Sequence, residues 1–221
     1  MLKRRNIIRI VAGREPHWRE LLFWTLLVAA FQSLEAGEMR RHIIGVAVTL
    51  AFLALAISSV GKLNGLGLEF TGWSQIGVRA VAVSLATGLL SGGTIVMVAL
   101  HCHQRLGAER GWNQVILAVI VGPVIEEVVF RGYLLTGALL LERHASNNDR
   151  HWPSVVGVAL VFMFAHRAQA GTTWIQLGCI MLTGTVYGLI RLRFQSTVAS
   201  VLAHGCYNLV LYLSVWIGIS S

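Results

Sequence analysis

Long segments without a single charged side chain recur along this chain, almost to its last residue. Residues 43–60 contain no Asp, Glu, Lys or Arg, and neither do residues 196–219. A helix of about 20 apolar residues is long enough to cross the hydrocarbon core of a bilayer. The sequence therefore predicts an all-α protein, a polytopic transmembrane helical bundle.

Composition supports the same conclusion. Of the 221 residues, 55% are hydrophobic and only 13% are charged, which is not the composition of a soluble domain. We expect one integral membrane domain over residues 1–221. The net charge of +8 does not indicate a nucleic-acid partner, because the basic residues cluster at the ends of apolar segments, where they act as topology signals. The three cysteines are scattered without a CxxC pair and predict no disulfide framework.

The apolar segments predict about seven helices, within a range of six to eight. The expected segments are residues 21–34, 43–60, 75–100, 114–141, 153–166, 172–190 and 196–219. When the N-terminus is placed in the cytoplasm, the loops on the cytoplasmic side carry more Lys and Arg than the loops on the opposite side. The positive-inside rule therefore favours a multi-pass protein with a cytoplasmic N-terminus. If residues 21–34 do not span, the later loops exchange sides.

Three charged residues interrupt the apolar segment 114–141. Glu126, Glu127 and Arg131 lie within one and a half turns of helix. A charge at the centre of a bilayer helix costs at least about 2.5 to 3.5 kcal/mol on insertion scales, so such groups persist when they pair or face a polar cavity. The stretch is therefore a candidate functional site.

Helix geometry separates the roles of these three side chains. Glu127 and Arg131 are four residues apart, with the acid nearer the N-terminus, which is the favoured order for an ion pair. Glu126 is rotated about 100° from Glu127, so we expect Arg131 to hold Glu127 and leave Glu126 available. Pro123 removes a backbone donor and can kink the helix, which opens room for water beside Glu126.

Two more polar motifs lie in other apolar segments. Phe162 and His166 share one helix face, and so do His204 and Asn208, since each pair is four residues apart. A single intramembrane histidine is usually hydrogen-bonded packing, and a Glu–Arg pair is often a structural clamp. Three polar sites in separate apolar helices are harder to explain as packing, because each needs partners in lipid.

Together these residues resemble a known family. Glu126-Glu127-x-x-x-Arg131, Phe162-x-x-x-His166 and His204-x-x-x-Asn208 resemble, in order, the three signature motifs of the CAAX protease and bacteriocin-processing family. This family of intramembrane proteases, also called the Abi family, includes the Ras-converting CAAX endopeptidase. The motifs lie within residues 115–219, which we take as the catalytic core, whereas the first ~110 residues carry no family motif.

The resemblance implies an intramembrane endopeptidase that hydrolyses a peptide bond of a membrane-embedded or lipidated substrate. It implies that Glu126 and His166 activate a water, and that His204 and Asn208 stabilise the tetrahedral oxyanion. These residue types suit those roles, because a carboxylate can act as a general base and imidazole and carboxamide groups can donate to an oxyanion. Glu127 would then support Glu126 within the active site, and Arg131 and Phe162 would be structural.

The cofactor is either none or zinc. Glu126, His166 and His204 form a two-His, one-Glu set that leaves one position open for water on a catalytic zinc. No HExxH motif is present, and the same three groups can act as a metal-free glutamate protease. We favour the metal-free chemistry.

Two other classes of function fit an intramembrane Glu and His. One is a transporter or proton relay, although the sequence has no inverted repeat. The other is a non-catalytic scaffold that binds a peptide or lipid in a polar pocket. A further candidate feature, His101-x-His103, lies at a helix end and is best explained as a solvated interfacial cap. The sequence does not distinguish a prenylated CAAX tail, a bacteriocin leader and a membrane-protein segment as the substrate.

Overall fold

Helices are the only regular elements in the described part of the chain. The computed structural model describes residues 76–103, 106, 111–145, 151–166 and 173–218. Separate helices in this part are α4 (Val78–His101), α8 (Trp152–Ala165), α9 (Trp174–Phe194) and α10 (Thr197–Trp216). The all-α class is therefore confirmed. The expected segments 21–34 and 43–60, and with them the total number of helices, lie outside the described residues.

The expected helix 114–141 is helical throughout, but it is not a uniform α-helix. It consists of α5 (Trp112–Ile116), α6 (Gly122–Glu127) and α7 (Leu135–Ala145), joined by two π-helical stretches, η4 (Leu117–Val121) and η5 (Val128–Leu134). Such π-helical insertions are rare and often occur at functional sites. Here they lie immediately before and after the turn that carries Glu126 and Glu127.

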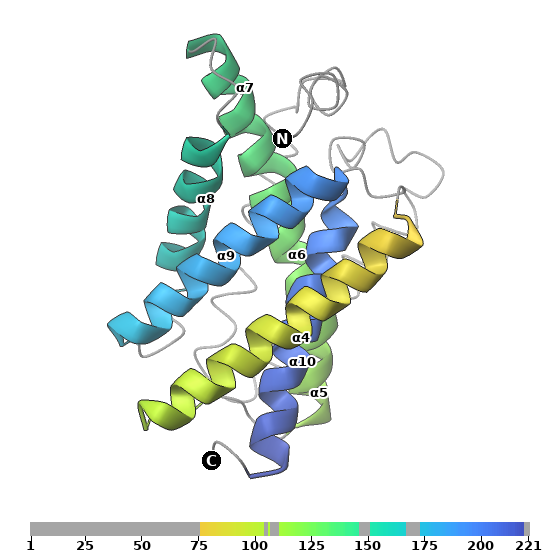
Figure 1. Ribbon diagram of the computed structural model, residues 1–221, viewed down its shortest axis with the longest axis vertical. Helices are drawn as coiled ribbons and strands as arrows, with labels where there is room; N and C mark the ends of the chain where they lie inside the picture. The colour runs from red at the N-terminus through yellow and green to blue at the C-terminus, as the bar shows by residue number, and fades with distance from the viewer. Residues whose placement is uncertain (1–75, 104–105, 107–110, 146–150, 167–172, 219–221) are drawn as a thin grey trace.

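The helices alternate in direction and pack as a bundle in which α10 contacts both α4 and α6. Figure 1 shows α4 crossing in front of α10, and α9 running beside α8, with the long α5–α7 helix behind them. The main apolar core joins this long helix to α8 and α9. Its buried members are Ile125, Val128, Val129, Phe130, Leu135, Leu139, Val155, Val158, Phe162 and Leu192.

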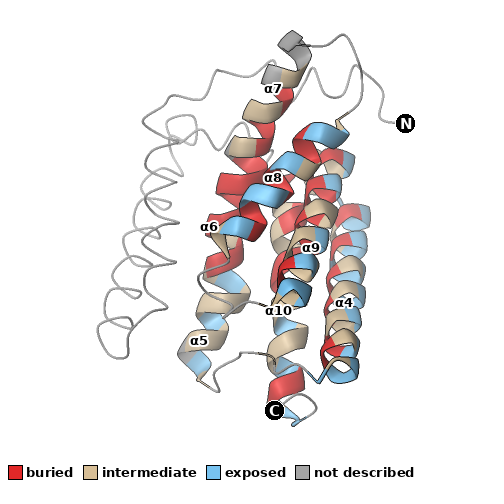
Figure 2. Cartoon of the chain, turned by 90° about the vertical axis from the view of Figure 1, so that its left-hand side faces the viewer, coloured by how far each residue is buried: buried red, intermediate tan, exposed pale blue. Residues whose placement is uncertain are grey.

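Three of these helices, α4, α9 and α10, are long and apolar enough to cross a membrane, and α8 is a shorter apolar helix. Large apolar side chains face outward, such as Leu90 with 73% and Met97 with 66% of its surface exposed. Charged side chains, by contrast, are buried on α6 and η5, where most residues are coloured as buried in Figure 2. An apolar exterior around a charged interior is the pattern of an integral membrane protein.

Glycines set how closely α10 approaches its neighbours. A Cβ atom at Gly88 of α4 would lie 2.5 Å from the carbonyl oxygen of Ala203, and one at Gly92 would lie 2.8 Å from Cβ of Val210. On the other side of α10, a Cβ atom at Gly205 would lie 2.6 Å from the carbonyl oxygen of Val119. Because only hydrogen fits at these positions, backbones come into direct contact on both sides of His204.

Candidate active site

Glu127 and Arg131 form the ion pair that their spacing predicts. Arg131 Nη1 lies 3.0 Å from Glu127 Oε1, and both side chains are fully buried. Arg131 also donates from Nη2 to the carbonyl oxygen of Gly184 at 2.9 Å, and its guanidinium lies 4.3 Å from the ring centroid of Phe162. A Cβ atom at Gly184 would lie 3.1 Å from Arg131 Nη2, so a glycine leaves the room that this contact needs. Helices α8 and α9 thus hold Arg131 in place.

His204 of α10 binds the same carboxylate. Its Nδ1 lies 3.0 Å from Glu127 Oε1, and its Nε2 lies 3.9 Å from Glu126 Oε2. An ionised carboxylate only accepts hydrogen bonds, so we assign the proton of the neutral ring to Nδ1. Tyr187 stacks on this ring with a centroid separation of 5.0 Å and an interplanar angle of 22°. Glu127 and Tyr187 therefore fix the orientation of His204 and turn Nε2 toward Glu126.

His166 approaches Glu126 from the end of α8. Its Nδ1 lies 2.9 Å from the carbonyl oxygen of Phe162, which can only accept, so Nδ1 is again the donor. Its Nε2 lies 3.4 Å from Glu126 Oε2. The two histidines therefore direct their Nε2 atoms at one carboxylate oxygen, in a site where Glu126 is 5% exposed.

Asn208 lies one turn beyond His204 on α10, and its amide binds the backbone of η4. Its Nδ2 donates to the carbonyl oxygen of Ala118 at 2.6 Å. This carbonyl lacks a partner within its own helix because the N–H of Gly122 bonds to Leu117, and Pro123 has no N–H to offer. The structure thus places one N–H of the Asn208 amide on the π-helical stretch that precedes the acids, and the role of Asn208 at the oxyanion stays a prediction. Pro123 itself is buried.

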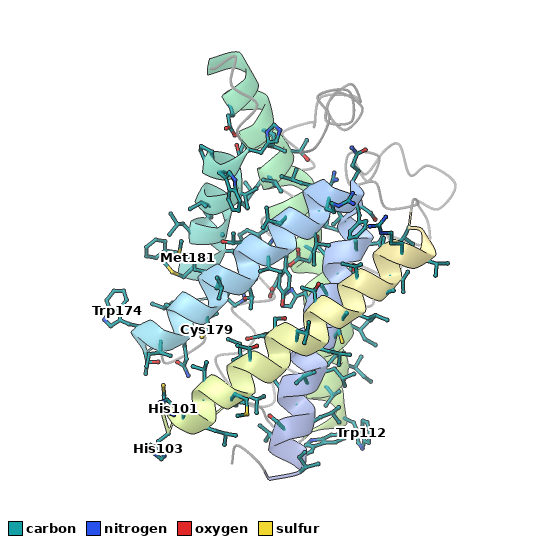
Figure 3. The ribbon with its side chains drawn as sticks, in the orientation of Figure 1. His101, His103, Trp112, Trp174, Cys179 and Met181 are labelled. Carbon is teal, nitrogen blue, oxygen red and sulfur yellow. The ribbon has the colours of Figure 1, made fainter. Side chains whose placement is uncertain are left out.

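Two sets of residues with histidines were considered as metal ligands, the pair His101 and His103 and the set Glu126, His166 and His204. His101 and His103 are exposed at the end of α4, away from α6 (Figure 3). Among the described residues, no group of three His, Cys, Asp or Glu side chains is placed to hold one metal ion. Glu126, His166 and His204 supply donors of a suitable type, with the two Nε2 atoms 3.4 Å and 3.9 Å from Glu126 Oε2, but they do not form such a group. We therefore derive no chemical step through a metal.

The contribution of α9 is what sequence reasoning missed. Gly184 and Tyr187 hold Arg131 and His204 in place, yet α9 carries none of the three motifs. The available signal was the pair Gly184 and Gly188, four residues apart, which marks a helix face that packs closely. A Cβ atom at Gly188, on that same face, would lie 3.0 Å from Cγ1 of Val155 in α8.

The fold and the site define a polytopic membrane protein with carboxylates and imidazoles gathered in its interior. Residues 108–210 match the family model Rce1-like, which is described as type II CAAX prenyl endopeptidase Rce1-like. Over this region the chain is similar to the CAAX protease family. No curated protein and no solved structure matches the chain.

Proposed function

We propose that this protein is an intramembrane endopeptidase in which Glu126 and His166 activate the water that hydrolyses a peptide bond. The match of residues 108–210 to a family model of CAAX prenyl endopeptidases supports a membrane-associated protein as the substrate, and a lipidated C-terminal segment as its reactive part. The observation that carries the mechanism is the position of Glu126 Oε2, which lies 3.4 Å from Nε2 of His166 and 3.9 Å from Nε2 of His204.

Charge balance supports one mobile proton in this group. The two carboxylates of Glu126 and Glu127 and the guanidinium of Arg131 sum to one negative charge. Burial favours neutral clusters, because an uncompensated charge is costly to remove from water. One further proton shared among Glu126, His166 and His204 makes the cluster neutral. When this proton is on Nε2 of His204, Glu126 is ionised and can act as the base.

The reaction then needs only groups of this site. Glu126 removes a proton from water as the water oxygen bonds to the scissile carbonyl carbon, and the π electrons of the carbonyl move to its oxygen. An imidazolium at His204, held by Glu127, faces this oxyanion through Nε2–H. The proton held by Glu126 and His166 passes to the amide nitrogen as the C–N bond breaks. Each step is a proton transfer or an electrostatic contact of a kind that enzymes commonly use.

The first prediction is that Glu126→Gln removes hydrolysis and leaves the fold intact, because glutamine keeps the shape and loses the base. The assay uses purified protein in liposomes with a farnesylated peptide that ends in a CAAX sequence, and mass spectrometry of the products. Glu142→Gln is the matched control. Glu142 lies on the same long helix, hydrogen-bonded to Ser154, away from the three motifs.

The outcomes of this assay distinguish the proposed glutamate-type mechanism from its alternatives. Cleavage by wild type and Glu142→Gln but not by Glu126→Gln supports the proposal, whereas turnover by Glu126→Gln at the wild-type rate contradicts it. Loss of activity with a chelator, together with stoichiometric zinc in the active protein, replaces the glutamate-type mechanism by a zinc-dependent one. An unprenylated peptide and a membrane-segment peptide, assayed in parallel, show whether lipidation is needed.

A further inference from the structure

Tyr187 of α9 is the one aromatic side chain stacked on the His204 ring in the described part of the chain, and the proposed chemistry gives it no role. Only 1% of its surface is exposed. Its own carbonyl oxygen accepts a hydrogen bond from Ser200 Oγ at 3.0 Å, which ties α9 to α10 beside the site. With its ring parallel to the imidazole at 5.0 Å, Tyr187 has little freedom to move.

The hydroxyl of this buried tyrosine has no hydrogen-bond partner among the described residues. Leaving a buried polar group unpaired costs about 1–3 kcal/mol, so each such group in a native protein calls for an explanation. A tyrosine hydroxyl can donate one hydrogen bond and accept others. A polar atom of a bound substrate would meet this need.

The proposed reaction also gains from a further hydrogen-bond donor at the oxyanion. One N–H of the Asn208 amide is engaged by Ala118 at 2.6 Å, which leaves its second N–H, and the Nδ1 proton of His204 is engaged by Glu127 at 3.0 Å. A tetrahedral intermediate is normally stabilised by more than one preorganised donor. Beside His204 Nε2 and the second Asn208 N–H, a further buried donor would add to the stabilisation of the oxyanion.

We propose that the Tyr187 hydroxyl donates a hydrogen bond to the substrate carbonyl oxygen as it becomes the oxyanion. The inference rests on the proposed function and adds a catalytic residue to it. The hydroxyl keeps its proton throughout, so water still adds through Glu126 and the amide nitrogen still receives its proton from the Glu126–His166 pair.

The test compares Tyr187→Phe with Tyr187→Leu and Tyr207→Phe. Phenylalanine keeps the stacked ring and removes only the hydroxyl, whereas leucine removes both. Tyr207 of α10 is the matched control, since its ring lies 6.5 Å from that of Tyr187 and does not stack on His204. We expect Tyr187→Phe to lower kcat by about 10²-fold or more, with KM unchanged and the unfolding midpoint equal or higher, and Tyr207→Phe to retain wild-type kinetics.

Wild-type kcat in Tyr187→Phe would overturn the inference. If Tyr187→Phe has wild-type kcat while Tyr187→Leu is inactive, the Tyr187 ring only positions His204, and this result also overturns the inference. A fall in activity matched by an equal fall in folded protein assigns the hydroxyl to stability instead. Failure of the proposed function is recognised separately, by absence of cleavage in wild type or by full activity of Glu126→Gln, and it removes the role of Tyr187 as well.

Discussion

At the scale of single residues, one carboxylate organises the site. Glu127 Oε1 accepts hydrogen bonds from Arg131 Nη1 and from His204 Nδ1, each at 3.0 Å. Because Arg131 also donates to Gly184, these bonds connect the long helix with α10 and α9. Charge-assisted bonds of this kind are roughly twice as strong as neutral ones. Glu126, with both of its ion-pair contacts to imidazoles, is left to react.

The buried ion pair predicts an unusual mutational pattern. Arg131→Met should lower the free energy of unfolding by about 3–5 kcal/mol, because it leaves the Glu127 charge buried without its cation. The double variant Glu127→Gln with Arg131→Met should recover much of this loss, since no unpaired charge remains and glutamine still accepts from His204. The stability of both variants is measured as the unfolding midpoint in detergent titrated with SDS.

Arg193→Met is the matched control for this pair of variants. Arg193 is exposed at the end of α9, so the same substitution there should change stability little. A double variant as unstable as Arg131→Met would show that Arg131 acts through Gly184 and Phe162 rather than by compensating the charge of Glu127.

Sequence reasoning predicted the pair of Glu127 and Arg131 within one helix, and the family resemblance brought Glu126 and His166 together, but the contact of His204 with Glu127 was not predicted. The pair of Glu127 and Arg131 follows from a spacing of four residues. The contact of His204 with Glu127, 77 positions apart, depends on how α10 and α6 are rotated and how deep each lies in the membrane. Periodicity within one segment does not determine these quantities. For the same reason, the backbone partner of Asn208 was not foreseen.

At the scale of elements, the π-helical stretches explain why the acid-bearing helix needs α10. In η4 the hydrogen bonds shift register, so the carbonyl of Ala118 depends on Asn208 for a donor. Gly205, one residue after His204, lets α10 approach Val119 of the same stretch. Apolar length predicted the helix over 114–141 correctly, but neither propensity nor hydropathy signals such a local change of register.

The packing of α4 on α10 gives a prediction at this scale. Gly88→Ala should lower stability by about 1–3 kcal/mol, because its Cβ atom would lie 2.5 Å from the carbonyl oxygen of Ala203. Ala203 precedes His204, so a displacement of α10 also moves the imidazole. A misplacement of about 1 Å in a reacting group can cost about 10²-fold in rate. Unfolding midpoint and kcat should fall together.

Gly93→Ala is the control on the same helix. A Cβ atom there would meet nothing within 4 Å, and alanine is the better helix former, so stability should be equal or slightly higher. Equal effects of the two alanine variants would mean that helix propensity, and not the approach of α4 to α10, determines the response at Gly88.

At the scale of the whole molecule, the helix ends divide into two groups. The starts of α4, α8 and α10 lie with the ends of α7 and α9, and the opposite group contains the ends of α4 and α10 with the starts of α5 and α9 (Figure 1). Arg79 and Arg193 are exposed in the first group, whereas Trp112 and Trp216 pack against each other in the second, 4.7 Å apart. Tryptophan pairs of this kind are typical of a membrane interface.

This division predicts the orientation in the membrane. Because arginines favour the cytoplasmic side, we expect the start of α4 to face the cytoplasm and its end to face the opposite side. Gly77→Cys and His103→Cys mark the two ends, since both positions are exposed and a side chain at Gly77 would meet nothing within 4 Å. Each is made in a background in which Cys102, Cys179 and Cys206 are replaced by alanine.

A membrane-impermeant maleimide should label Gly77→Cys only from the cytoplasmic face of sealed vesicles, and His103→Cys only from the opposite face. Addition of detergent should then expose both thiols equally, which controls for local reactivity. The reversed pattern would contradict the expected orientation. Because the described helices alternate in direction, reversal would place the error before α4, and a cytoplasmic N-terminus would then require that just one of the segments 21–34 and 43–60 crosses the bilayer.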